Sequence, residues 1–138
     1  TRTTYAYTDA THTSVAADAS GLSEDAYMAK STTRRGVLNT SALKQVTYYK
    51  GTVKGDELAN FSQEYNYSGS AVKTTTNYDY TGTGSDILNK TTVYTDSAAR
   101  EVRKEDFAVS DKKSETVYAG TVKGQEIANY TDNFKIYI

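Results

Sequence analysis

The 138-residue sequence contains no cysteine and no proline. Without cysteine there is no disulfide, no thiolate metal site and no cysteine nucleophile. Average usage predicts about seven prolines in a chain of this length, and sheet proteins use proline to keep exposed edge strands from pairing with neighbours. The absence of proline is therefore compatible with sheet edges that are meant to pair.

An excess of charge of one sign is also missing, because 16 basic residues are balanced by 17 acidic ones. The chain has no excess of positive charge that would attract nucleic acid or anionic lipid, so we expect neither as a partner. Long apolar runs are absent too, and none approaches the roughly 20 residues that a membrane-spanning helix needs. We therefore expect no membrane span.

Aliphatic residues are scarce, since Ile, Leu, Val and Phe together number 22. The 13 tyrosines supply the missing apolar area, because each ring can bury roughly 150–250 Å² while its hydroxyl stays hydrated or finds a partner. Together with 22 threonines, they favour a pleated, half-buried sheet. The composition therefore predicts an all-β protein.

One stretch of the sequence occurs twice. Residues 47–67, TYYKGTVKGDELANFSQEYNY, align with residues 116–136, TVYAGTVKGQEIANYTDNFKI, at an offset of 69, and ten of the 21 positions are identical. Self-similarity at a fixed period is the signature of a repeat architecture. We expect two tandem repeats of about 69 residues, 1–69 and 70–138, whose β-hairpins share a sheet or a sandwich, because neither repeat could bury enough surface alone.

The expected strands follow from alternating side chains and from turn residues. The repeated stretch reads as a hairpin, because Gly55 in Lys54-Gly55-Asp56 can take the positive φ of a tight turn. Thr1–Thr8 matches Thr76–Thr81, but at an offset of 73. The predicted strands are Thr1–Thr8, Val46–Val53, Glu57–Tyr67, Ala71–Thr81 and Asp86–Asp96.

Two further segments are harder to assign. Leu22–Lys30 has the acidic first turn of a short helix, with Ser23 as its cap. Ser97–Phe107 fits a charged edge strand or a short helix, and the strand is favoured because the offset of 69 aligns it with Ser31-Thr32-Thr33. The same offset sets Arg34 and Arg35, at an expected turn or bulge, against Arg103 and Lys104.

Alternation along Glu57–Tyr67 also predicts which face is buried. Phe61 and Tyr65 share one face, which we expect to be buried. Asn60 and Ser62 lie on the opposite face, which we expect to be solvated.

The repeat pattern is cyclic. The first hairpin continues into the strand of Tyr78 and Tyr80, whereas the second ends on the apolar strand Phe134–Ile138, and its continuation is found in Thr1–Thr8. We therefore expect the chain to be one period of a longer tandem array, or a subunit that docks end to end with other copies. The expected assembly residues are Thr3, Tyr5, Tyr7, Phe134, Ile136 and Ile138.

Five of the seven asparagines lie in Asn-x-Ser/Thr acceptors for N-linked glycans. Serine and threonine make up 34 of the 138 residues, so chance alone predicts about two such acceptors. Attached glycans and an incidental product of a Thr-rich sheet are equally open explanations. The candidates are Asn39, Asn60, Asn66, Asn89 and Asn129.

Catalytic and metal sites are not indicated. The sole histidine, His12, has no cysteine or second histidine for a metal site and no triad around it. Glu57 and Glu126 recur at matching positions, which in a repeat protein favours a structural role. No calcium-loop spacing connects Asp79, Asp86 and Asp96. We expect no enzyme, no metal and no cofactor.

Two Tyr-x-Tyr strand ends, Tyr5-Ala6-Tyr7 and Tyr78-Asp79-Tyr80, combine with Thr-rich strands and Gly turns to resemble the YD/RHS class of bacterial surface repeats. Only the second approaches the Tyr-Asp core of that class, and the Gly-Arg-Leu that follows the core is missing. More broadly, the chain resembles tandem-repeat surface proteins of bacteria. That resemblance implies extracellular or cell-surface β-rich fibres with covalent glycans.

The leading hypothesis is a structural segment or subunit of an extracellular, glycosylated filament, whose partner is another copy of itself through end-to-end strand pairing. The alternative is a carbohydrate-binding or adhesive β-sandwich module, in which Tyr48, Tyr49 and Tyr118 form a sugar-stacking surface. A hydrolase is the third hypothesis and would need paired acidic groups in a concave site.

Overall fold

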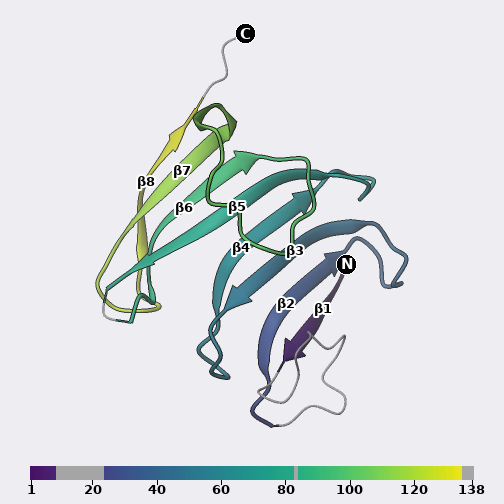
Figure 1. The fold of residues 1–138 in the computed structure, drawn as a ribbon, viewed down its shortest axis with the longest axis horizontal. Helices are drawn as coiled ribbons and strands as arrows, with labels where there is room; N and C mark the ends of the chain where they lie inside the picture. The colour runs from purple at the N-terminus through teal and green to yellow at the C-terminus, as the bar shows by residue number, and fades with distance from the viewer. Residues whose placement is uncertain (9–23, 83, 135–138) are drawn as a thin grey trace.

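The computed structural model describes residues 1–8, 24–82 and 84–134. In these residues, eight strands form one antiparallel sheet and lie in it in chain order, with β1 and β8 at opposite edges (Figure 1). The strands are β1 (Arg2–Thr8), β2 (Tyr27–Arg34), β3 (Leu43–Lys50), β4 (Leu58–Tyr65), β5 (Val72–Thr81), β6 (Ile87–Thr95), β7 (Lys112–Ala119) and β8 (Ile127–Asn133), and a short 3-10 turn, η1 (Val109–Asp111), precedes β7.

The predicted all-β class is thus confirmed, and so are the strands expected in both copies of the repeated hairpin and in the segments around Thr1–Thr8, Ala71–Thr81 and Asp86–Asp96. The turn of the first hairpin uses Gly55 at a φ of 89°, next to an Asp56 N–H that donates to the Val53 carbonyl at 3.1 Å. Within the described part of the chain, no helix is long and apolar enough to cross a membrane.

The pairing of strands β1 to β4 recurs in strands β5 to β8. Tyr5 lies opposite Ser31 as Tyr78 lies opposite Thr91, so β1 corresponds to β5 at an offset of 73 and β2 to β6 at an offset of 60. Strands β3 and β4 correspond to β7 and β8 at an offset of 69. The β1 offset is the one that the sequence predicts. The β2 offset is not, because the connection from β6 to β7 is longer than the one from β2 to β3.

The irregularities of the ladder recur as well. The register shifts between Ala6 and Tyr7 and again between Asp79 and Tyr80, which are related by the offset of 73. The shift between Tyr48 and Tyr49 is matched by one between Val117 and Tyr118, at the offset of 69. A bulge bends its strand and increases the local twist, so equal bulges give the two halves of the sheet the same local bends.

The interior is unusually polar. Among the described residues, the buried apolar side chains are Val46, Phe61 and Val72, and the Phe61 ring stacks on Tyr48 with centroids 4.6 Å apart. The buried polar residues are Ser31, Ser62, Gln63, Thr74, Thr75, Asn77 and Thr92. Buried polar groups are tolerated when they are hydrogen-bonded. Some of the partners lie within the sheet, as with the Ser31 and Tyr49 hydroxyls 3.2 Å apart, and others come from a second layer on the sheet, as for Gln63 and Asn77.

That second layer is the connection between β6 and η1, residues 96–108, which we call the strap. It leaves the end of β6, crosses in front of β5 and β4 and returns to β7 (Figure 1). Phe107 of the strap stacks on Tyr94 of β6 with ring centroids 4.2 Å apart. The sheet therefore has one face covered locally by an irregular segment and not by a second sheet.

Three sequence-based expectations are wrong. Leu22–Lys30 is not a helix in its described part, because Tyr27–Lys30 belongs to β2 and pairs with β1. Ser97–Phe107 is not a strand, since it forms most of the strap. Ser62 is not solvated, because this residue is 3% exposed, whereas Glu64 on the same face is exposed as expected. In each case pairing or packing between distant segments overrides the local pattern.

Candidate functional site

Gln63 of β4 anchors the strap to the centre of the sheet. Its side-chain N–H groups donate to the Thr75 hydroxyl at 3.0 Å and to the Ala98 carbonyl at 2.9 Å, and its carbonyl oxygen accepts from the Arg100 N–H at 2.9 Å. Gln63 is 1% exposed, and an amide this deeply buried is costly unless its hydrogen bonds are made. We call the pairing of the neighbouring strands β4 and β5 the inner seam. Through Gln63, the strap is hydrogen-bonded to this seam.

Asp96 fixes the start of the strap. Its carboxylate accepts from Arg100 Nε at 2.7 Å, from Arg100 Nη2 at 3.0 Å and from the Thr75 hydroxyl at 2.7 Å, and it also caps the Ser97 N–H at 2.9 Å. Burial alone would raise the pKa of Asp96, but the hydrogen bonds from Arg100 and Thr75 outweigh it and lower the pKa to about 2. The carboxylate form therefore stabilises the folded state.

This pKa predicts an acid-sensitive strap. The folded-state pKa of about 2 lies below the ordinary value of 3.8, so the stabilisation is present above about pH 5 and is lost as the pH falls through 4 towards 2. Between pH 6 and pH 2, we expect the wild-type free energy of unfolding in urea to fall by about 2 kcal/mol more than that of Asp96→Asn. Parallel losses in the two proteins would contradict this.

Arg103 ties the strap to both strands of the inner seam. Its guanidinium donates to the Asn60 carbonyl of β4 at 3.1 Å and to the Tyr78 carbonyl of β5, and it forms ion pairs with Asp79 and, at 2.8 Å, with Glu105. The Arg103 side chain is 14% exposed. The planar guanidinium carries several N–H donors, so this one side chain contacts two backbone carbonyls and two carboxylates at the same time.

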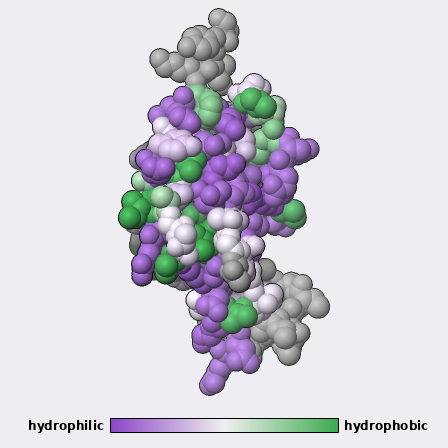
Figure 2. Space-filling model, turned by 90° about the vertical axis from the view of Figure 1, so that its left-hand side faces the viewer, coloured by the Kyte–Doolittle hydropathy of each residue, from purple (hydrophilic) through white to green (hydrophobic). Residues whose placement is uncertain are grey.

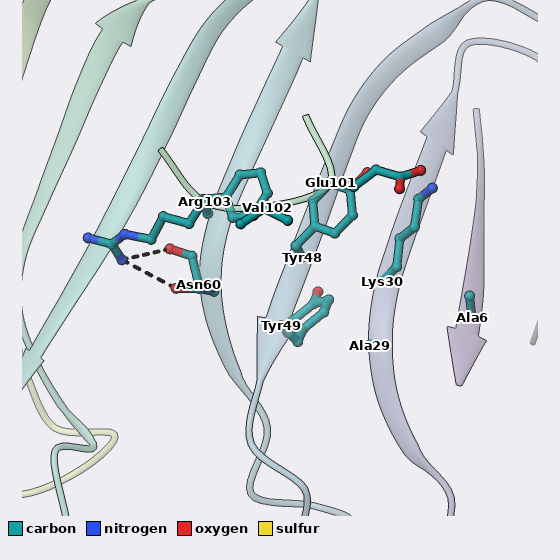
Figure 3. A pocket seen from close by; sticks show the side chains of 10 residues that line it. Ala6, Ala29, Lys30, Tyr48, Tyr49, Asn60, Glu101, Val102 and Arg103 are labelled. Atoms are coloured by element: carbon teal, nitrogen blue, oxygen red, sulfur yellow. Dashed lines mark hydrogen bonds between the residues drawn. The ribbon is translucent and has the colours of Figure 1, made fainter. Parts of the chain in front are cut away.

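A groove of about 760 Å³ lies between the strap and strands β1 to β4. Its lining includes Lys30, Tyr48 and Glu101, and the guanidinium of Arg103 extends away from Lys30 and towards the inner seam (Figure 3). Lys30 Nζ lies 5.4 Å from the centre of the Tyr48 ring. Burial, followed by the negative charge of Glu101, raises the pKa of Tyr48. The groove therefore combines an aromatic wall with a cation and an anion.

The two outer strands present open edges. Within the described residues, no strand pairs with the outer side of β1 or of β8. Every residue of β8 is exposed, as are the first four of β1. Unpaired N–H and C=O groups in such rows are templates for pairing with another strand.

Comparisons with protein-family models, with curated proteins and with solved structures give no match for this chain.

Among the predicted assembly residues that the structure describes, Thr3, Tyr5 and Tyr7 lie on β1, and Phe134 directly follows the end of β8. The Thr3 hydroxyl lies 2.8 Å from that of Thr33, Tyr5 is 47% exposed, and Tyr7 is half-buried. Phe134 is 44% exposed, and its N–H donates to the Lys113 carbonyl at 2.9 Å. The remaining two predicted residues, Ile136 and Ile138, lie outside the described part of the chain.

The candidate glycosylation sites fall into two groups. Asn60 receives a hydrogen bond from Arg103 at 3.3 Å, and Asn66 organises a turn by accepting from the Ser70 N–H at 3.0 Å. The other three sites are exposed, namely Asn39, Asn89 and Asn129. A glycan therefore finds space most readily at these three positions.

The candidate acidic residues have structural roles. Glu57 accepts a hydrogen bond from the Met28 N–H at 2.9 Å, which lowers its pKa. In the described residues, no cluster of three or more histidine, cysteine, aspartate or glutamate side chains could hold a metal ion. His12 lies outside the described residues. Sequence reasoning missed Gln63 of β4 and the strap residues Asp96 and Arg103, because each of them has a partner far away in the chain.

Proposed function

We propose that this chain is a structural segment of an extracellular, glycosylated protein filament in which the β8 edge of one copy pairs with the β1 edge of the next. The two halves of the sheet act as tandem repeats, residues 1–69 and 70–138. The contact is head to tail, and such a contact extends without closing.

The observation that carries the proposal is the recurrence of the strand pairing. Because β8 corresponds to β4 and β1 corresponds to β5, the outer edges of the sheet have the positions of the two strands that already pair at the inner seam. Joining β8 of one copy to β1 of another repeats a junction that the fold already contains. The copies can be separate chains or successive segments of one longer chain.

The surface around β8 fits this mode of pairing. Figure 2 shows the side of the molecule on which β8 lies, and its hydrophobic residues are scattered among hydrophilic ones instead of gathering in one patch. A large apolar patch would indicate face-to-face packing. Pairing through the β8 edge instead uses backbone hydrogen bonds and polar side chains, as in strand addition.

Glycans fit the same arrangement. Asn129 has the position of Asn60, but Asn60 is contacted by Arg103, whereas Asn129 is exposed. A sugar at Asn129, Asn39 or Asn89 would cover the outside of a filament without disturbing the strap. The proposal places such a glycosylated filament outside the cell or at the cell surface.

The alternative function, carbohydrate binding by a single module, is supported by the groove. Tyr48 presents an aromatic wall there, and Lys30 and Glu101 supply a hydrogen-bond donor and an acceptor. Such a combination suits a sugar ring. Two observations weigh against it: one face of Tyr48 already stacks on Phe61, and Tyr118 lies on β7, away from the groove.

Sedimentation and electron microscopy of the purified chain over a range of concentrations test the proposed function. The filament hypothesis predicts species that grow with concentration far beyond the 15.1 kDa of one chain. A species that stays at that mass and binds oligosaccharides in the groove would favour the alternative. Intact mass of native material reports attached sugar and chain continuity in the same experiment.

A further inference from the structure

We propose that opposite charges on the two edges set the contact between copies in one register. Glu115 and Asp132 form an acidic row at the β8 edge, and Arg2 and Arg34 form a basic row at the β1 edge. The inference rests on the proposed filament, and it names the residues that meet.

The register follows from the inner seam. There Phe61 lies opposite Asn77, Ser62 opposite Thr76, and Gln63 opposite Thr75. Adding 69 to a β4 residue number gives the equivalent residue of β8, and subtracting 73 from a β5 residue number gives the equivalent residue of β1. Each pair at the inner seam thereby predicts a pair between two copies. The resulting pairs are Tyr130 with Thr4, Thr131 with Thr3, and Asp132 with Arg2.

Each edge by itself carries an unfavourable pair. On the β1 edge, Arg2 lies directly opposite Arg34, and on the β8 edge, Asp132 lies directly opposite Glu115. Like charges facing each other across two strands are destabilising. Arg34 donates to the Ser41 carbonyl at 2.9 Å, and Glu115 pairs with Lys112 at 3.2 Å. Among the described residues, no ion pair involves Arg2 or Asp132.

The proposed register joins the two rows so that unlike charges meet in the middle. Reading across the contact, the order becomes Glu115, Asp132, then Arg2 and Arg34 of the next copy. Asp132 and Arg2 take the places of Gln63 and Thr75, whose side chains already touch at 3.0 Å. Opposite charges at such a position attract each other. In a shifted register like charges would face each other, and their repulsion would disfavour that register.

The length of the chain connections explains why charged residues suit the outer contact but not the inner seam. Residues 96–111 connect β6 to β7 and provide the strap over Gln63, whereas the corresponding connection from β2 to β3 is only residues 35–42. The outer contact therefore has no counterpart of the strap in the described residues. Its central pair stays near water, where a charged pair avoids the cost of burial.

A tyrosine adds a second contact to this register. At the inner seam, the Tyr80 hydroxyl donates to the Ala59 carbonyl at 2.7 Å. The same offsets place the Tyr7 hydroxyl of the next copy at the Ala128 carbonyl of the preceding one. Tyr7 thus acquires an assembly role that depends on this register.

Cysteine cross-linking tests the register directly, because the natural chain has no cysteine. The Tyr130 and Thr4 positions form a pair of close side chains in the proposed register, so Thr4→Cys with Tyr130→Cys should give disulfide-linked ladders under mild oxidation. The matched control, Ala6→Cys with Tyr130→Cys, shifts the register by two residues on the same face and keeps both Arg2 and Asp132. We expect at least tenfold slower cross-linking in the control. Faster cross-linking in the control would overturn the register.

Charge reversal tests the electrostatic part. Asp132→Arg alone should raise the critical concentration for assembly roughly tenfold, and adding Arg2→Asp should restore it. High salt should weaken the wild-type contact but change little in a variant with both residues replaced by Ser. Filaments that form equally well in all variants would overturn this inference but leave the proposed function intact. Wild-type protein that forms no filaments under any condition would overturn the proposed function itself.

Discussion

Replacing Thr131 by proline is expected to leave the chain folded but to prevent its assembly. Thr131 lies opposite Thr116 with the two hydroxyls 2.8 Å apart, and the Phe134 N–H, three residues further on, points towards β7. Because N–H directions alternate along a strand, the Thr131 N–H points outward, where the next copy would pair. Proline removes that donor and suits only unpaired edges.

We expect the critical concentration for assembly to rise at least roughly 100-fold in Thr131→Pro, since a ladder hydrogen bond is lost and the proline ring meets the incoming strand. Thr131→Ala keeps the N–H and is the matched control, which should assemble almost normally. Sedimentation velocity measures both, and urea unfolding checks that both are folded. Undiminished fibres of folded Thr131→Pro would rule out the β8 edge as the contact.

Blocking one edge leaves the other available, which gives a sharper version of the experiment. A Thr3→Pro variant should lose the β1 edge in the same way, because Thr3 has the position of Thr76 at the inner seam. Each variant alone should remain monomeric, but an equimolar mixture should give dimers and nothing larger. Dimers in either variant alone would indicate a different, symmetric contact.

Replacing Arg103 by methionine is expected to cause the largest loss of stability among single substitutions in the strap. Methionine keeps much of the side-chain length but cannot donate to the Asn60 and Tyr78 carbonyls, which lie under the strap. It also leaves Asp79 without its partner. Removing one member of a buried polar network of this kind costs about 3 kcal/mol.

Arg35→Met is the matched control, because Arg35 lies in the short connection between β2 and β3 and donates to only one carbonyl, that of Tyr67, at 3.1 Å. We expect it to cost less than about 1 kcal/mol. Urea unfolding measures both variants. Release of the strap should also speed trypsin cleavage after Arg100 and Lys104 in Arg103→Met. Equal stability and equal cleavage rates in the two variants would show that the strap does not depend on Arg103.

Local patterns predict most strands correctly, because alternation and turn glycines act within a few residues. The hairpin turn at Gly55 and the correspondence of Thr1–Thr8 with β5 both follow from such signals. Tyr27–Lys30 shows the limit of this reasoning. Its helix-like composition is overridden by pairing with β1 and β3, which lie far apart in the sequence.

The strap could not be predicted from periodicity. Its residues neither alternate nor follow a helical period, and its hydrogen bonds join Ala98 and Arg100 to Gln63, which lies more than 30 residues earlier. One signal was available, because aligning β2 with β6 leaves extra residues between β6 and β7. The cross-strand charges of Arg2 and Asp132 were likewise visible only after the register was known.

Helical reconstruction of the assembled filament by electron cryomicroscopy tests the central claim most directly. A continuous sheet of eight strands per copy, spaced about 4.8 Å apart, predicts a repeat of roughly 38 Å along the hydrogen-bonding direction. The β8 strand of each copy should lie one strand spacing from β1 of the next, with Asp132 opposite Arg2. Copies that contact each other through the faces of the sheet, with both edges left unpaired, would contradict the account.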